Sequence, residues 1–283
     1  MIIMKMKGGL GNQMFEYALA RRLSLEYNQH LVLDTFSYIR DRKRNFELDN
    51  YNVKYDSKNG LKTFFYNILY KIYKESLNNK FKVSLEKKLF VFQDEIFQYK
   101  YSYLNGYWQN PKYFESIRDI LLEDFRYKGE LTEVEEQIIQ TIQSQNSVAV
   151  HFRRDDYLNQ ENTSFFEVQS LDSYSQAINH MKKKIPQACF YVFSDDIDWC
   201  KNNLKEIDNV VFIDGTTSSS HHIDFLIMKS CKHFIIANST FSWWAAWLSE
   251  SENKQVIIPN KWFKDKEIND NSKVLVLEGW IVM

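Results

Sequence analysis

The sequence predicts an α/β protein of two domains, the second of which is built around a mainly parallel sheet. Its 283 residues exceed the usual length of one domain, and 44% of them are hydrophobic, which is enough for a sizeable core. Short apolar runs alternate with segments of helical periodicity, and this pattern is typical of parallel strands joined by helices. The composition therefore favours a folded α/β chain and excludes disorder.

The first domain, expected at residues 1–126, begins with a strand, a glycine turn and a helix. Residues 2–6 form an apolar run that ends at Gly8-Gly9-Leu10-Gly11, and apolar residues at helical spacing follow from Met14 to Leu23. The other elements expected in this domain are strands at 31–33 and 101–107 and a helix from Pro111 to about Phe125.

A lysine-rich helical insertion, at about residues 60–95, interrupts the first domain. Between Lys62 and Lys88 it carries seven lysines against two glutamates, in a chain whose net charge is −1. Its apolar residues from Phe64 to Tyr73 follow a helical stripe. We expect a solvated helix packed on the domain; the alternative is a helix that touches an anionic membrane surface or a lipid-linked acceptor.

Six short apolar runs predict the sheet of the second domain, expected at residues 127–283. Most of them are separated by segments long enough for a helix, which suggests a mainly parallel sheet with both faces covered. The six runs are 148–150, 190–193, 210–213, 234–237, 256–258 and 274–277.

Charge and cysteine content limit the classes of binding partner and the cellular compartment that we expect. The 36 Lys and Arg residues are balanced by 37 Asp and Glu residues, so we expect no nucleic acid as a partner. Three cysteines without CxxC spacing predict neither a disulfide framework nor a Cys-rich zinc site, which fits a reducing cytosol. With no signal-peptide core and no apolar run near the roughly 20 residues of a membrane span, we expect a cytoplasmic chain, at most peripheral at the inner face of the plasma membrane.

Polar clusters follow three of the runs in the second domain, and the ends of strands are where ligands collect in open parallel sheets. The first cluster extends from His151 to Asp156. If the extended path continues past residue 150, His151 and Arg153 share one face, and Arg153 aims its donors at a phosphate. Arg154 then pairs with Asp156 and stiffens the loop. A structural ion-pair knot is the alternative.

The second cluster is Ser194-Asp195-Asp196. Asp196-Ile197-Asp198 fits the Asp-x-Asp pattern with which metal-dependent glycosyltransferases hold Mg²⁺ or Mn²⁺. Asp198, however, lies where the second residue of a helix is expected, and Ser194 or Asp195 can cap that helix. We therefore expect a capping role here and no metal site.

The third cluster is Asn238-Ser239-Thr240-Phe241, which lies between a strand and a helix expected at 241–248. Its hydroxyls and the first helical N–H groups would face one spot, where an anion can bind. Simple N-capping by Ser239 or Thr240 is the alternative. Three tryptophans in the same helix, Trp243, Trp244 and Trp247, are expected to be core residues.

The glycine turn of the first domain matches a dinucleotide-binding fingerprint only in part, because Met14 stands where the third glycine is expected. Gly9 and Gly11 still allow a tight turn. We therefore expect main-chain N–H groups and the amides of Asn12 and Gln13 to approach a ligand.

Taken together, five ordered motifs resemble the bacterial α-1,2-fucosyltransferases of glycosyltransferase family 11, over nearly the whole chain. Asp155 stands where that family usually carries glycine. The motifs are GGLGNQMFEYALARRLS at 8–24, GYWQNPKYF at 106–114, HFRRDDYL at 151–158, FSDD at 193–196 and CKHFIIANSTFSWWAAWL at 231–248, and IIPNKWF at 257–263 also matches.

The resemblance implies a GT-B fold, in which two Rossmann-like domains face a cleft. The first would be the acceptor-side domain, and the second would hold GDP-fucose, the donor substrate, without a metal or another cofactor. The implied contacts are His151 and Asp195 or Asp196 with guanosine, Arg153 with the β-phosphate, and Ser239, Thr240 and Phe241 with the pyrophosphate.

The same resemblance implies inverting, metal-independent transfer of L-fucose from GDP-β-L-fucose to the 2-hydroxyl of a terminal β-galactoside. The acceptor would be an oligosaccharide or a lipid-linked glycan, as in O-antigen biosynthesis. We expect Arg153, Arg154 and Asp156 to act in catalysis, with Asp156 or Glu161 as a candidate base. The alternatives are a metal-dependent GT-A transferase that uses Asp196 and Asp198, or a nucleotide-sugar-binding protein without turnover.

Overall fold

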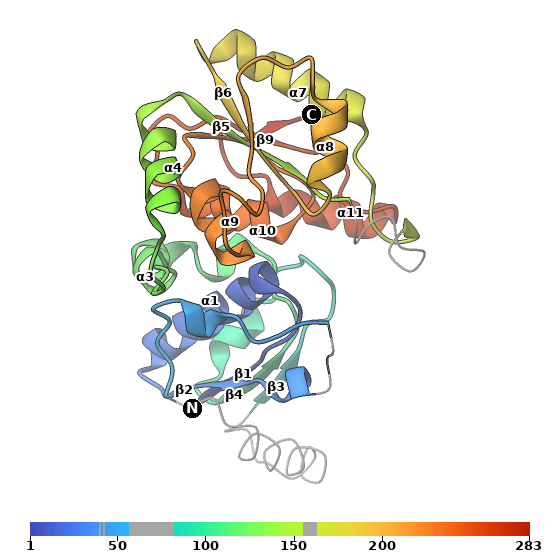
Figure 1. Cartoon of the computed structure of the whole chain (residues 1–283). Coiled ribbons are helices and arrows are strands. Elements are labelled where there is room, and N and C mark those ends of the chain that lie inside the picture. The colour runs from blue at the N-terminus through green and yellow to red at the C-terminus, as the bar shows by residue number, and fades with distance from the viewer. Residues whose placement is uncertain (40, 42, 57–81, 155–162) are drawn as a thin grey trace. The chain divides into compact units, whose positions relative to one another are not determined.

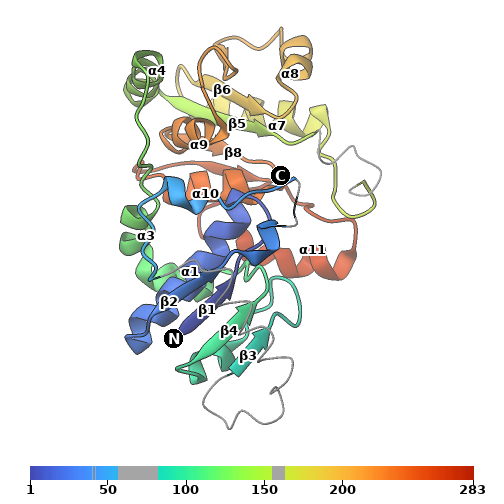
Figure 2. The ribbon, with the colours of Figure 1, turned by 60° about the horizontal axis from the view of Figure 1, so that its bottom comes forward.

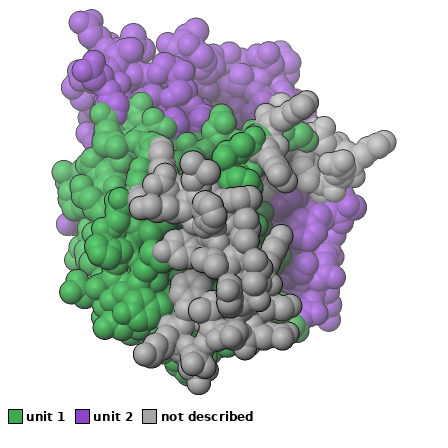
Figure 3. Space-filling model, turned by 90° about the horizontal axis from the view of Figure 1, so that it is seen from below, with its two compact units in different colours: residues 1–128 green, residues 129–283 purple. Residues whose placement is uncertain are grey.

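The computed structural model describes residues 1–39, 41, 43–56, 82–154 and 163–283. These residues form two compact units, unit 1 at residues 1–128 and unit 2 at residues 129–283 (Figure 3). The division falls two residues beyond the boundary that the sequence predicts. No helix in the described ranges is both long enough and apolar enough to cross a membrane.

Unit 1 is an α/β unit whose described strands form one parallel sheet in the order β2-β1-β4-β3 (Figure 2). Ile2 of the inner strand β1 is in register with Leu31 on one side and Ser102 on the other. The glycine turn leads from β1 into α1. This helix packs on the sheet, and most of its residues are buried there. The bounds are β1 (Ile2–Lys5), α1 (Leu10–Tyr27), β2 (Leu31–Asp34), β3 (Lys82–Leu85), β4 (Ser102–Asn105) and α3 (Arg118–Asp124).

Unit 2 has a parallel sheet in the order β10-β9-β8-β5-β6-β7. Helices α7 and α8 pack against one face of this sheet in a single apolar cluster, and α4, α9 and α10 lie on the other side (Figure 1). The strands are β5 (Ser147–Phe152), β6 (Cys189–Ser194), β7 (Val210–Phe212), β8 (His233–Ile235), β9 (Val256–Ile258) and β10 (Ile281–Val282). The helices are α4 (Glu133–Ser144), α7 (Leu171–Lys184), α8 (Ile197–Asn203), α9 (His221–Lys229), α10 (Thr240–Leu248) and α11 (Lys266–Ser272).

Local sequence explains where several of these helices begin. In α4, the Thr132 side chain accepts from the N–H of Glu135, and the Glu135 carboxylate accepts from the N–H of Thr132. This capping box satisfies two N–H groups that the helix itself leaves unpaired. Ser170 caps α7 and Asp265 caps α11 in the same general way, each through a side-chain oxygen.

Three predictions from the sequence are wrong or need correction. Residues 274–277 do not form a strand: α11 continues into a 3₁₀ turn at Lys273–Leu275 that buries Leu275, and β10 takes the place in the sheet. The helical insertion at about 60–95 contains β3, because residues 82–85 pair with β4. Most of its lysine-rich stripe lies outside the described residues. The helix expected from Pro111 is divided, since 3₁₀ turns at Pro111–Tyr113 and Glu115–Ile117 precede α3.

Candidate active site

The three polar clusters of unit 2 meet at one edge of its sheet. Strand β5 lies between β6 and β8, and all three run parallel. The residues that follow them therefore leave the sheet at the same edge, the carboxyl edge. As the sequence predicts, this edge gathers the two arginines, the two aspartates and the start of α10 from segments up to 90 residues apart.

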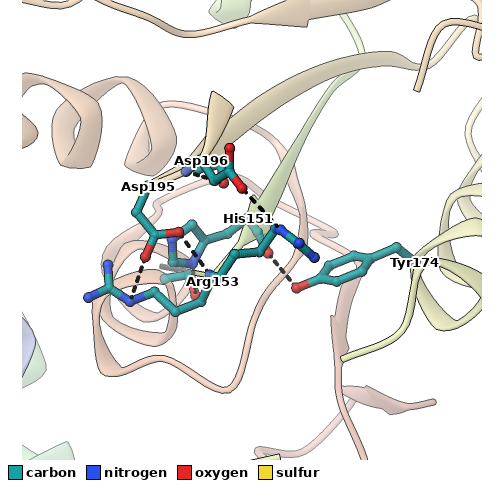
Figure 4. A network of polar contacts seen from close by, with 8 residues as sticks. His151, Arg153, Tyr174, Asp195 and Asp196 are labelled. Carbon is teal, nitrogen blue, oxygen red and sulfur yellow. Dashed lines mark hydrogen bonds and ion pairs between the residues drawn. The ribbon is translucent and has the colours of Figure 1, made fainter. Parts of the chain in front are cut away.

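Two arginine–aspartate pairs link the end of β5 to the end of β6 (Figure 4). The Nε atom of Arg153 lies 3.3 Å from Oδ2 of Asp195, and the main-chain N–H of Arg154 donates to Oδ1 of the same carboxylate at 2.8 Å. The Nε atom of Arg154 lies 3.4 Å from Oδ2 of Asp196. Asp195 thus contacts both the guanidinium of Arg153 and the main chain of Arg154. Together with Asp196, it positions the two arginines side by side at this edge.

Arg154 also stacks on an aromatic ring. Its guanidinium carbon lies 3.6 Å from the centre of the Trp199 ring, in the range of a favourable cation–π contact. The expected partner Asp156 lies outside the described residues, so that pairing stays a prediction. Among the described contacts, Asp196 and Trp199 hold Arg154.

Asp196 is the N-cap of α8. Its Oδ1 accepts from the N–H of Trp199 at 3.2 Å, and its own N–H donates to Oγ of Ser194 at 2.9 Å. A capping role is therefore correct, but the cap is Asp196, and neither Ser194 nor Asp195 caps the helix. Asp198 lies exposed in the first turn. With one carboxylate engaged by Arg154 and a helix end, the Asp-x-Asp pattern is explained by capping.

His151 is buried behind the arginines, with 5% of its surface exposed. Its Nδ1 lies 2.9 Å from Oγ of Ser242, and its carbonyl accepts from the Tyr174 hydroxyl at 2.9 Å. Burial, and secondarily the charge of Arg153, lower the pKa of His151 to about 3. The ring is therefore uncharged at neutral pH, and it joins β5 to α10.

The start of α10 has no capping bond from the side chain at its N-cap position. Ser239 occupies the N-cap position, but its side chain makes no capping bond, so N-capping by this hydroxyl is wrong. Thr240 and Phe241 are partly exposed. First-turn N–H groups without an internal cap favour an anion at this point. The tryptophans of α10 are buried, as expected, and Trp243 donates its indole N–H to the carbonyl of Leu275 at 2.9 Å.

Asn238 has a structural role. Its Nδ2 donates to the carbonyl of Glu167 at 2.8 Å and to that of Trp262 at 3.0 Å, and the residue is buried. Both amide N–H groups are thus used within unit 2. Asn238 fixes the segments around the start of α10, and its side-chain donors are not directed at a ligand in this structure.

The glycine turn of unit 1 has the tight geometry that the sequence predicts. Gly8 has φ of +74°, which favours glycine, Gly9 is the N-cap of α1, and Gly11 lies in the first turn. The Gln13 amide, however, is used internally: it donates to the carbonyls of Gly8 and Asn45 and accepts from the N–H of Glu47. The Gln13 amide therefore stabilises the turn and does not have the ligand-binding role expected from the sequence.

Asn12 connects two motifs that lie far apart in the sequence. Its Oδ1 accepts from Nε2 of Gln109 at 2.8 Å, which joins GGLGNQ to GYWQNP at the ends of β1 and β4. Sequence reasoning missed this link, as it missed the parts of Tyr174, Trp199 and Ser242 in unit 2. Ser242 and Trp199 stand within or beside quoted motifs, whereas Tyr174 carries no sequence signal.

Comparison with known proteins decides the family. The profile of glycosyl transferase family 11 matches residues 1–283. The chain belongs to this family. It is 35% identical over 287 residues to an Escherichia coli alpha-1,2-colitosyltransferase, covering 95% of this chain and 94% of that one. It is 32% identical over 300 residues to the Escherichia coli O-antigen biosynthesis glycosyltransferase WbnK, covering 98% of both.

Family 11 membership identifies the protein as a glycosyltransferase. A solved structure of NodZ alpha-1,6-fucosyltransferase, soaked with GDP-fucose, resembles it with a TM-score of 0.53 at 13% identity, over 87% of this chain and 91% of that one. This similarity concerns the fold, and it confirms the predicted α/β class of GT-B type. The GT-A fold of the alternative is therefore wrong.

Proposed function

We propose that this family 11 glycosyltransferase transfers L-fucose from GDP-β-L-fucose to the 2-hydroxyl of a terminal β-galactoside, with inversion and without a metal. The ordered motifs support fucose and the galactoside acceptor. The alpha-1,2-colitosyltransferase relative supports the 1,2 linkage. The O-antigen relative supports a glycan acceptor, which we propose is an oligosaccharide or a lipid-linked glycan.

The observation that carries the proposal is the pair of arginines at the carboxyl edge of the unit 2 sheet. Arg153 and Arg154 are held there by the carboxylates of β6 and by Trp199. A guanidinium is permanently charged and presents several donors in a plane, which suits a diphosphate. The uncapped start of α10, at the end of the neighbouring strand β8, adds main-chain donors.

This arrangement suits a reaction in which negative charge grows on a phosphate. The bond between the sugar C1 and the β-phosphate oxygen breaks, and its electron pair stays with GDP. The acceptor hydroxyl forms the new bond to C1 from the opposite face, which converts a β-linked donor into an α-linked product. Its proton passes to a base, for which Asp156 and Glu161 are the candidates. Fixed cations at the phosphate stabilise this charge without reorganising, and loss of one such donor typically costs about 10²–10³ in rate.

His151 contributes to this site as a neutral group. A protonated ring would add a third positive charge beside the two arginines, which Asp195 and Asp196 already pair. Because burial lowers its pKa to about 3, the ring keeps its hydrogen bond to Ser242 across the physiological range. We propose that His151 and the exposed part of the Asp195 and Asp196 carboxylates border the guanosine.

A donor and acceptor panel tests the proposal. GDP-fucose, GDP-colitose and GDP-mannose are each incubated with β-galactosides and matched β-glucosides, in buffer with excess EDTA, and product linkage is read by NMR. We expect an α-1,2-fucosyl galactoside in EDTA. Loss of turnover in EDTA that Mn²⁺ restores contradicts metal independence. GDP binding without any transfer contradicts catalysis.

Colitose is the second candidate for the transferred sugar. The observation in its favour is the 35% identity with the alpha-1,2-colitosyltransferase. Colitose is fucose without the 3-hydroxyl, so the two donors present the same diphosphate to the arginines. A kcat/KM for GDP-colitose more than about tenfold above that for GDP-fucose would reassign the donor, since tenfold corresponds to about 1.4 kcal/mol.

A further inference from the structure

Unit 1 carries a group of titratable side chains at the carboxyl edge of its own sheet. Lys7 follows β1, Glu86 follows β3 and Tyr107 follows β4, while Glu16 reaches the same place from α1. We call these four residues the Lys7 cluster. Since β1, β4 and β3 are adjacent and parallel, their carboxyl ends meet where ligands bind in open α/β sheets.

Glu16 is the unusual member of the Lys7 cluster. Its side chain is fully buried, and Oε2 accepts from the main-chain N–H of Lys7 at 3.0 Å. Its other oxygen, Oε1, is buried and has no hydrogen-bond partner among the described residues. A buried acceptor without a partner costs stability, so its retention calls for a reason other than folding.

Burial acts on every charge of the cluster. It raises the pKa of Glu16 well above its ordinary value, raises that of Glu86 and lowers that of Lys7. The ammonium of Lys7 lies 4.2 Å from the centre of the Tyr107 ring. Groups whose pKa values are shifted together at the end of a sheet are typical of ligand and active sites.

The backbone beside the cluster is rigid. Glu86 accepts from the main-chain N–H groups of Tyr107 at 2.7 Å and Trp108 at 3.2 Å. A Cβ at Gly106 would lie 2.3 Å from that of Glu86, so only glycine fits. Trp108 has φ of +54°, which is rare for a bulky residue. Such a loop places its groups in advance, as binding sites require.

The chemistry of the cluster selects a neutral, hydroxylated ligand. The carboxyl groups of Glu16 and Glu86 face the ammonium groups of Lys7 and Lys5, so opposite charges offset one another and the cluster has little attraction for a phosphate. A hydroxyl can both donate to a carboxylate and accept from Lys7. The partly exposed Tyr107 adds an aromatic surface beside these polar groups. These are the requirements of a sugar, whose hydroxyls alternate with C–H groups.

We propose that the Lys7 cluster binds the hydroxyl groups of a sugar, with Lys7 and Glu86 as contacts and the buried Glu16 as a positioning residue. That this sugar is the acceptor galactoside rests on the proposed function. The cluster would then contribute mainly to acceptor affinity, while the donor is held by groups of unit 2.

Glu16→Gln in the full chain is the decisive variant. Glutamine keeps the size of the side chain and an oxygen for the N–H of Lys7, but its amide cannot ionise. We expect KM for a β-galactoside to rise at least tenfold, kcat to change less than threefold, and Kd for GDP to stay unchanged. We also expect thermal stability at neutral pH to change little, because the amide replaces a protonated carboxyl of nearly the same size. Lys7→Met should raise KM in the same way.

Asp124→Asn is the matched control. Asp124 forms an ion pair with α1, with its Oδ2 at 2.8 Å from Nε of Arg21, and it also accepts from the Tyr17 hydroxyl. Its loss should lower thermal stability and leave KM for the galactoside unchanged. If Glu16→Gln behaves like this control, the Lys7 cluster is a structural ion pair and the inference is overturned.

Direct binding separates this inference from the proposed function. Saturation-transfer NMR with methyl β-galactoside and GDP measures occupancy without turnover. If the wild type binds the galactoside and Glu16→Gln does not, the cluster is a sugar site, even where no fucose is transferred. Galactoside binding that is equal in both proteins, or absent from the wild type, overturns it.

Discussion

The charged side chains at the carboxyl edges of the two sheets differ in pairing and in burial. In unit 2, Arg153 and Arg154 each lie beside an aspartate, and all four side chains keep partial contact with solvent. In unit 1, Glu16 is fully buried, one of its oxygens has no partner within the part of the chain that the structure describes, and burial lowers the pKa of Lys7. Paired and partly exposed charges suit exchange with an anionic ligand, whereas buried groups suit hydrogen bonding to a neutral one.

We therefore expect the carboxyl edges of the two sheets to respond differently to substitution and to pH. Removing a group from unit 2 takes away a donor that acts on a charged transition state, so the rate changes most. Replacing Glu16 takes away a carboxyl whose ionisation is costly in a buried position, so affinity and the pH dependence of stability change instead.

Arg153→Ala should have the largest effect, a fall of about 10²–10³ in kcat, because it removes a fixed cation from the leaving phosphate. Arg153→Lys, which keeps the charge but loses the planar fork, should recover only part of the rate. Steady-state kinetics with GDP-fucose and a galactoside measure both variants, and circular dichroism checks their fold. An Arg153→Ala enzyme with more than about a tenth of the wild-type kcat removes this arginine from the mechanism.

His151 should make the protein less stable as pH falls. Its pKa is about 3 in the folded state against an ordinary 6.5, so the unfolded chain takes up a proton that the folded chain refuses. Stability is therefore lost as pH drops from 6.5 towards 3, with a slope of at most about 1.4 kcal/mol per pH unit. Urea unfolding of the wild type and His151→Gln between pH 4 and 7.5 measures the slope. Equal slopes in both proteins contradict the burial of a neutral ring.

Glu16 should act with the opposite sign. Its pKa is raised in the folded state, so the folded chain keeps a proton that the unfolded chain releases above its ordinary value of 4.5. Stability is therefore lost as pH rises above 4.5, until the folded carboxyl also ionises. Lys5 and Lys7 weaken the effect, while Glu86 strengthens it, and Tyr38 and Tyr107 also face the group.

The same unfolding experiment with Glu16→Gln should show that this loss disappears. In the double variant with His151→Gln, both contributions should vanish and the pH profile should flatten. A Glu16→Gln protein whose profile matches the wild type would mean that the carboxyl is ionised in the folded state at neutral pH.

Asp195→Asn should have the smallest effect, roughly a tenfold loss of kcat, on the scale of about 1.4 kcal/mol for one charge-assisted contact. The amide keeps an oxygen for the N–H of Arg154 but no longer pairs with the Arg153 guanidinium. Asp198→Asn, in the first turn of α8, is the matched control and should keep full activity. If Asp195→Asn instead raises Kd for GDP and leaves kcat intact, Asp195 contacts the nucleotide.

Short-range patterns account for most elements that the sequence predicted correctly. The runs at 148–150 and 190–193 became β5 and β6 because apolar residues with helical segments between them have few other ways to be buried. The GGLG turn was readable since Gly8 adopts a positive φ that favours glycine. The strand predicted at 274–277 is wrong, because a short apolar run can also be buried in a 3₁₀ turn, as Leu275 is here.

By itself, the sequence determined the family, the α/β class and the three clusters at the ends of strands, since all of these depend on local order along the chain. Only the tertiary structure decided the partners: Asp195 for Arg153, Asp196 for Arg154, and Ser242 for His151. The physical reason is that a carboxylate close in sequence and one from a neighbouring strand serve an arginine equally well. Strand order and burial, which no local pattern encodes, make the choice between them.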